Sequence, residues 1–214
     1  MKLGSIALAA AAAAAAAVAL APAAGMAATA PKKPTVPAAA PAMSQFDQGA
    51  AAYGRADYAT AYRMWRPLAD QGHASAQYNL GVSYDKGQGV VQDYAAAVSW
   101  YRKGADQGEA LAQHNLGLMY ANGQGVTQDY AAAVSWYRKA ADQGNAGAQI
   151  NLGVMYSKGQ GVAQDYVQAH KWYNLAAVSG DADAVKNRDI VAAKMTPAQI
   201  GEAQKLARVW KPTK

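Results

Sequence analysis

Residues 77–112 read QYNLGVSYDKGQGVVQDYAAAVSWYRKGADQGEALA, and the next two blocks of 36 residues repeat this sequence with few changes. Residues 113–148 read QHNLGLMYANGQGVTQDYAAAVSWYRKAADQGNAGA, and residues 149–184 read QINLGVMYSKGQGVAQDYVQAHKWYNLAAVSGDADA. A fixed period of this size is typical of a solenoid, in which each unit buries its apolar face only against its neighbours. Because solenoids mostly present surface to partners, the repeat favours a binding protein over an enzyme with a deep pocket.

Each block has the pattern of two helices joined by a glycine-rich turn. In the first block, Leu80 and Tyr84 lie four residues apart on one helical face, which predicts a helix over residues 74–86. The turn KGQGV stops this helix, since two closely spaced glycines allow positive φ angles. Asp93 is then the expected N-cap of a second helix over residues 94–107. Each block is therefore predicted to be a helix–turn–helix unit.

Positions that are identical between blocks are the simplest candidates for the core. Glycine recurs inside the first helix at residues 81, 117 and 153, although it costs about 1 kcal/mol relative to alanine there. We therefore expect these glycines to mark a close approach between helices that a side chain would block. Large leucine and aromatic side chains would fill the space between helix pairs. The predicted core comprises Leu80, Tyr84, Trp100, Leu116, Tyr120, Trp136, Leu152, Tyr156 and Trp172.

The repeat pattern extends towards the N-terminus, whereas it changes after Gly180. Residues 57–72 match the second half of a block, which gives a first, atypical helix pair. Thr196 followed by Pro197 predicts the N-terminus of a last helix, and such an atypical end would cover the final apolar face. The sequence thus predicts an all-α solenoid of about four repeats in residues 44–184. The repeats are expected at about residues 44–76, 77–112, 113–148 and 149–184, followed by basic C-terminal capping helices at residues 185–214.

The N-terminal region differs in composition from the repeats. Residues 1–27 hold one lysine followed by a long run rich in alanine, which is the layout of a cleaved secretory signal peptide. An uncleaved transmembrane anchor is the alternative, and the small residues that follow favour cleavage near residues 27–30. Residues 28–43 are rich in proline and alanine and predict an extended linker. We therefore expect a periplasmic or secreted protein with no stable membrane insertion after cleavage.

Cysteine content and charge narrow the classes of function. The absence of cysteine excludes disulfides, thiolate metal sites and cysteine nucleophiles. Residues 44–184 hold 10 Lys plus Arg against 12 Asp plus Glu, whereas residues 185–214 hold 7 against 2. The repeats lack the basic footprint of a nucleic-acid-binding protein, so we expect no nucleic-acid partner. The basic C-terminal segment would suit contact with anionic envelope polymers, with a solvated helix face as the alternative.

Short motifs recur at fixed spacing, namely NLG, GQGV, DY and WYRKAADQG. On these motifs, residues 46–183 resemble the Sel-one-like repeat family, a relative of the tetratricopeptide repeats. The C-terminal segment KMTPAQIGEAQKLARVW also resembles that of bacterial members. The resemblance implies a right-handed superhelix of antiparallel helix pairs whose first helices line the concave face. It also implies a scaffold or adaptor for other proteins, often in the bacterial envelope or in host interaction, without catalytic residues.

The sequence offers no candidate catalytic, cofactor-binding or metal-binding residue. His73, His114 and His170 fall in different units, whereas a metal site needs several ligands to converge. The GQG turns join two helices and lack the lysine and hydroxyl of a phosphate-binding loop. The aspartate that recurs before each second helix is explained by capping. We therefore expect a non-enzymatic protein without a cofactor.

Positions on the first helices that differ between blocks are candidates for partner contact. These are Tyr78, Ser83, His114, Met119, Ile150 and Met155. A stripe of methionine and tyrosine would suit an apolar helix or an extended peptide, with neutral drift or partial burial between units as alternatives. The sequence thus predicts a partner protein or peptide bound on the concave face. Binding of peptidoglycan or lipopolysaccharide through the basic C-terminal segment is the alternative function.

Overall fold

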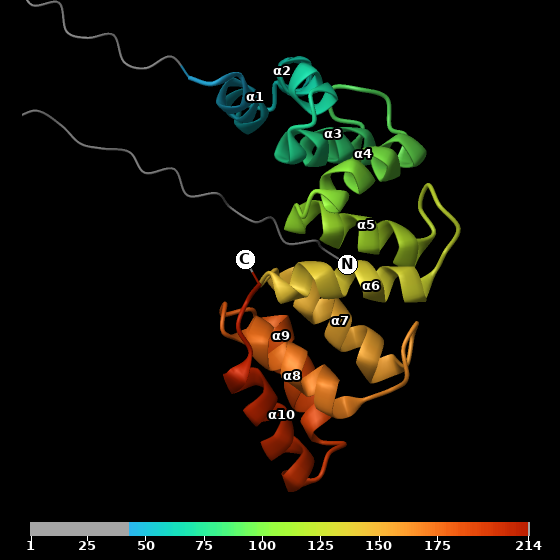
Figure 1. The fold of residues 1–214 in the computed structure, drawn as a ribbon, viewed down its shortest axis with the longest axis vertical. Helices are drawn as coiled ribbons and strands as arrows, with labels where there is room; N and C mark the ends of the chain where they lie inside the picture. Colours follow the sequence, from blue (N-terminus) through green and yellow to red (C-terminus); the bar gives the residue numbers. More distant parts are fainter. Residues whose placement is uncertain (1–42, 214) are drawn as a thin grey trace, which may run out of the picture. The chain divides into compact units, whose positions relative to one another are not determined.

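The computed structural model describes residues 43–213, which form ten α-helices and no strand (Figure 1). The predicted signal peptide and residues 28–42 of the predicted linker lie outside the described residues. The helices are α1 (Gln45–Gly54), α2 (Tyr58–Asp70), α3 (Ala74–Lys86), α4 (Tyr94–Asp106), α5 (Ala110–Asn122), α6 (Tyr130–Asp142), α7 (Ala146–Lys158), α8 (Tyr166–Ala177), α9 (Ala182–Ala192) and α10 (Pro197–Val209). No helix in this part of the chain is long and apolar enough to cross a membrane.

The helix boundaries follow from capping chemistry. The Asp93 carboxylate accepts a hydrogen bond from the Ala96 backbone nitrogen at 3.0 Å, and an aspartate caps α6 and α8 in the same way. Helix α3 ends at Gly87, whose φ of 66° lies in the left-handed region that favours glycine. Helices α5 and α7 end at equivalent glycines with φ of 68°. The predicted helix–turn–helix unit is confirmed.

The helices form four successive pairs, α1/α2, α3/α4, α5/α6 and α7/α8. Each second helix also packs against the first helix of the next pair, so the pairs form one continuous stack. Figure 1 shows this succession from α1 to α8 along the chain. The prediction of an all-α solenoid with about four repeats is confirmed.

A buried aromatic ring lies against the recurring glycine of each first helix. A Cβ atom at Gly81 would lie 2.4 Å from the Tyr101 ring, and the matching glycines of the next two pairs would meet a tyrosine at 2.6 Å. In the first pair, Gly49 and Trp65 take these places. The predicted close approach between helices is therefore a contact between a glycine and an aromatic ring.

The second glycine of each turn fixes the spacing between neighbouring pairs. Gly125 has a φ of 69°, and a Cβ atom there would lie 2.3 Å from the backbone oxygen of Tyr94. Gly89 and Gly161 hold the equivalent positions, at 2.3 and 2.2 Å from the matching tyrosine oxygens. The turn of one pair thus touches the start of the second helix of the pair before it, with no room for a side chain.

Buried glutamine side chains connect the pairs through hydrogen bonds. Gln113 donates its Nε2 to the Ala105 oxygen at 3.1 Å, and its Oε1 accepts a hydrogen bond from Gln143 at 2.8 Å. The preceding pairs repeat this arrangement through Gln77 and Gln107. These bonds satisfy polar groups at the helix ends, where an unpaired buried carbonyl would be costly.

The predicted core residues pack between the pairs to different depths. The three leucines are fully buried, and Trp100 and Trp172 are also buried. The remaining aromatic residues are half-buried and pack against the same clusters, namely Tyr84, Tyr120, Trp136 and Tyr156. Their position at the edge of the core lets a hydroxyl reach outward, as where Arg138 donates to Tyr156 Oη at 2.6 Å.

Helix α9 continues the repeat beyond Gly180. Ala184 is fully buried at the position held by a buried alanine in three preceding first helices, and Asn187 continues a series of asparagines. Helix α9 thus keeps two positions of a first helix, although the sequence pattern changes after Gly180 as predicted. Arg188 stands where the other helices have the core leucine, and its guanidinium pairs with Asp189 at 2.8 Å. Asp189 stands where the preceding first helices have the glycine against which the second-helix tyrosine packs, so the face on which a second helix would pack is charged.

Helix α10 packs against α8 rather than pairing with α9. Trp210, which follows α10, meets the Trp172 ring edge-on, with centroids 6.4 Å apart. Val209 occupies the repeat position of the buried tyrosines, yet it is 65% exposed. Beyond α10, the Thr213 nitrogen donates to the Asp142 oxygen at 2.8 Å. This segment covers the last pair, as the predicted C-terminal cap requires.

Candidate functional site

The first helices of successive pairs present a row of half-buried side chains. Helix α3 contacts α5 directly as well as through α4, so these first helices lie side by side. Each carries a variable residue followed by an asparagine, and α5 and α7 add an aliphatic residue one turn later. We call this set the first-helix surface, which comprises Tyr78, Asn79, His114, Asn115, Leu118, Ile150, Asn151 and Val154.

Hydrogen bonds connect this surface to the core and across pairs. Asn115 Nδ2 donates to the Tyr101 hydroxyl at 3.1 Å, and Asn151 Nδ2 lies 3.0 Å from His114 Nε2. Gly147 leaves room for the imidazole, because a Cβ atom there would lie 2.9 Å from His114 Cε1. Comparison of the blocks does not single out the asparagines as surface residues, because identity between blocks is also what core packing produces. The NLG motif itself was the available signal.

His114 is a neutral polar group on this surface at pH 7. Burial lowers its pKa from 6.5 to about 4, because the charged imidazolium loses hydration. The neutral ring presents one donor nitrogen and one acceptor nitrogen, and the acceptor can receive the Asn151 amide. This position therefore offers hydrogen bonds and a flat apolar ring, not a positive charge.

The structure places three of the six predicted contact residues inside the stack. Ser83, Met119 and Met155 are 2%, 3% and 7% exposed. Both methionines belong to buried clusters between neighbouring pairs, where a flexible thioether fills irregular gaps. This corrects the prediction that these three residues contact a partner, because they are buried inside the stack. Their variation between repeats reflects packing between neighbouring pairs. Tyr78, His114 and Ile150 lie on the first-helix surface, and their contact with a partner stays a prediction.

A pocket of about 340 Å³ lies where α7 meets α9, at the C-terminal end of the first-helix surface. Its walls are mainly apolar, and two lysines stand among them. The lining residues are Val154, Ser157, Lys158, Tyr173, Asn187, Ile190, Val191 and Lys194. The two lysines occupy the same position in successive 36-residue steps. Sequence comparison missed this pocket because it treated α9 as lying outside the repeat.

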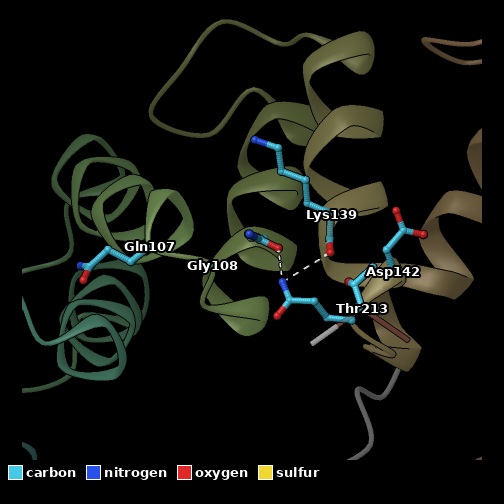
Figure 2. Close-up of a pocket in the computed structure, with 7 residues that line it drawn as sticks. Gln107, Gly108, Lys139, Asp142 and Thr213 are labelled. Atoms are coloured by element: carbon cyan, nitrogen blue, oxygen red, sulfur yellow. Dashed lines mark hydrogen bonds between the residues drawn. The ribbon is translucent and has the colours of Figure 1, made fainter. Parts of the chain in front are cut away.

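A second, more polar pocket of about 460 Å³ lies at the C-terminal ends of the second helices α4 and α6. Figure 2 shows Gln107 and Gly108 on one side of it, with Asp142 and Thr213 on the other. The dashed lines in Figure 2 are hydrogen bonds from Gln143 to Gln113 and to the Lys139 oxygen. The side-chain amides of Gln113 and Gln143 already bond each other across neighbouring pairs. The polar groups of this pocket therefore serve mainly to hold the repeats together.

The acidic and histidine side chains do not converge. Within residues 43–213, no group of three or more His, Cys, Asp or Glu residues could hold a metal ion. His73 serves as the N-cap of α3 through Nδ1, and His170 is buried in α8. Helix pairs that repeat and stack in succession define the class of α-solenoid repeat proteins.

The family follows from a comparison of the sequence with family models. The model described as Sel1 repeat matches residues 46–73, 74–109, 110–145 and 146–181. The chain belongs to the Sel1 repeat family, which confirms the resemblance that its motifs indicated. Proteins of this family generally act in protein–protein interaction, and their fold is typically a non-catalytic scaffold.

Two solved structures are similar to this chain. A Sel1 repeat protein from Oxalobacter formigenes is 34% identical with a TM-score of 0.62, over 76% of this chain and 74% of that chain. The protein c5321 is described as a protective antigen present in uropathogenic Escherichia coli strains that displays an SLR fold. It is 32% identical with a TM-score of 0.56, over 78% of this chain but only 44% of c5321. No curated protein matches the chain.

Proposed function

We propose that this protein is a non-enzymatic scaffold of the bacterial cell envelope that binds a partner protein or peptide along the first-helix surface. The family resemblance implies that this surface is the concave face of the superhelix. Sel1 repeat proteins generally act in protein–protein interaction, which gives the class of function. The envelope location rests on the signal peptide predicted over residues 1–27, which lie outside the described residues.

The observation that carries the proposal is the variation of side chains on a repeated framework. The buried leucines and tyrosines and the half-buried asparagines recur at each step, whereas the half-buried residue before each asparagine changes from Tyr78 to His114 to Ile150. A partner that lies across the pairs would therefore meet a different chemical group at each step. Such a row suits an extended peptide or a helix with one apolar face.

The proposal can be tested by photo-crosslinking from single positions in intact cells. Leu111 is 45% exposed on α5, so a photo-reactive amino acid there would sit on the first-helix side without disturbing the core. Ser99 is exposed on the second helix α4 and provides the matched control position. We expect a discrete cross-linked protein from position 111 and none from position 99.

A polar variant provides the second part of the test. With the photo-reactive residue kept at position 111, Leu118→Gln combined with Val154→Gln should abolish the cross-linked product, while Val91→Glu, at a site 88% exposed in the turn before α4, should leave it unchanged. Circular dichroism would check that all three proteins fold. Equal cross-linking from both positions, or a product that survives the double variant, would count against binding along the first-helix surface.

The alternative function is binding of peptidoglycan or lipopolysaccharide through the basic C-terminal segment. The observation in its favour is the charge of residues 185–214, with 7 basic against 2 acidic residues. Lys205 and Arg208 on α10 and the adjacent Lys211 are exposed. Changing these three residues to glutamine should reduce sedimentation of the protein with isolated cell wall. Unchanged sedimentation would leave the scaffold as the only supported function.

A further inference from the structure

The pocket between α7 and α9 combines an apolar lining with a cationic edge. Val154, Ile190 and Val191 provide aliphatic walls, and Tyr173 adds an aromatic ring. Ile190 is 50% exposed although it is a large apolar residue. An apolar group that entered the pocket would cover this surface, which is favourable in proportion to the area removed from water.

The two pocket lysines carry charges that the protein itself does not neutralise. Within residues 43–213 the ion pairs are Arg66–Asp70 and Arg188–Asp189, so neither Lys158 nor Lys194 is paired with a carboxylate there. Lys194 Nζ lies 5.5 Å from the centre of the Tyr166 ring, which holds it beside α8. Two such ammonium groups at one pocket complement a single anionic group.

The size of the pocket limits how large a part of a ligand can enter it together with the anionic group. A volume of about 340 Å³ is at the low end of the range for small-molecule sites, so it suits one residue better than a chain passing through. An internal aspartate or glutamate brings a carboxylate without a branched apolar side chain. The last residue of a polypeptide can bring both a carboxylate and an apolar side chain, since its α-carboxylate and its side chain are attached to the same Cα atom.

We propose that this pocket binds the carboxyl terminus of a partner chain that ends in an apolar residue. Lys158 and Lys194 receive the terminal carboxylate, and the aliphatic walls receive the last side chain. Asn187 continues the asparagine series of the first-helix surface and lies where it can bond the backbone of the bound residue. The inference rests on the proposed function, and it places the carboxyl terminus of the partner at the C-terminal end of the first-helix surface.

The test uses fluorescein-labelled peptides of sequence Gly-Ser-Gly-Ser-X, where X is Leu, Ile, Val or Phe. Each peptide is made with a free carboxylate and with a terminal amide, and binding to the full chain is followed by fluorescence anisotropy. We expect at least one acid to bind about tenfold or more tightly than its amide, because charge-assisted hydrogen bonds to the carboxylate are lost in the amide.

Three variants separate the pocket from general attraction to a basic protein. Lys158→Gln combined with Lys194→Gln should reduce the affinity for the acid to that for the amide. Ile190→Asn should weaken both forms by removing an apolar wall without changing the charge of the pocket. Lys86→Gln is the matched control, because Lys86 holds the same repeat position on α3, away from the pocket. The substituted side chains are exposed, and thermal unfolding would check that the variants fold.

Several results would overturn the inference. These are equal binding of acid and amide, absence of binding by all four acids, or full binding by the double lysine variant. Binding of octanoate without binding of any peptide acid would assign the pocket to free fatty acids and would also overturn it. Photo-crosslinking from position 111 distinguishes the two proposals, since a partner still captured there would preserve the scaffold function while this pocket assignment fails.

Discussion

Substitution of Gly125 by alanine tests how the turns hold neighbouring pairs together. An alanine at φ 69° costs about 1–2 kcal/mol in backbone strain. Its Cβ atom would also lie 2.3 Å from the Tyr94 backbone oxygen, and relief of such overpacking typically costs about 1–3 kcal/mol more. We therefore expect Gly125→Ala to lower the free energy of unfolding by about 2–5 kcal/mol.

Gly123→Ala provides a control within the same turn. Gly123 has a nearly identical φ of 68°, but a Cβ atom there meets only the Gln128 side chain and backbone, at 3.2 Å or more. Gly123→Ala should therefore lower the free energy of unfolding mainly through backbone strain, by about 1–2 kcal/mol. Urea unfolding followed by circular dichroism would compare both variants with the unmodified protein, with the slope checked for loss of cooperativity. Equal losses in the two variants would refute a specific contact between the turn and the preceding pair.

Three further predictions concern the core and the first-helix surface. Tyr101→Phe should lower the free energy of unfolding by about 1–3 kcal/mol, because the Tyr101 hydroxyl bonds the Asp85 carboxylate and the Asn115 amide. Tyr137→Phe is the control, because the Tyr137 hydroxyl has no such bond in the described part of the chain. It should cost less in the same urea titration. The His114 pKa is lowered from 6.5 to about 4 in the folded protein, so the unfolded chain takes up a proton first as the pH falls. The titration of His114 should therefore lower the free energy of unfolding by about 3 kcal/mol between pH 7 and pH 4, and His114→Gln should show a smaller decrease between these pH values. Gln113→Leu should cost about 1–3 kcal/mol, since two buried hydrogen bonds are lost; a neutral effect on the thermal midpoint would show that these bonds add little.

The fold was largely predictable because each local signal agreed with the 36-residue period. Asp93 marks a helix start, which recurs in all four pairs, and Gly87 marks a helix end, which recurs in the last three. Helix α9 was harder to place, because Arg188 replaces the leucine that identifies a first helix. Only the position of α9 in the stack shows that its alanine and asparagine remain in register.

The candidate site was less predictable, because variation between repeats has two physical origins. At the position of Tyr78, variation falls on a half-buried surface. At the position of Met119 it falls on a buried contact between pairs, where the side chain must fit neighbours that also change. Periodicity alone does not separate these cases, since both positions lie on the same helix. The lysine pocket required the placement of α9, so no pattern within the repeats indicated it.

The charged face of α9 determines where this protein can grow. A helix pair inserted between α6 and α7 would meet a leucine-bearing first helix on one side and an apolar second helix on the other. A second helix appended after α9 would have to pack on Asp189, which stands where the other first helices have glycine, and would bury the ion pair of Asp189 with Arg188. Lengthening by duplication is therefore permitted within the array and blocked at its C-terminal end. The same charges disfavour end-to-end stacking of separate molecules into fibres.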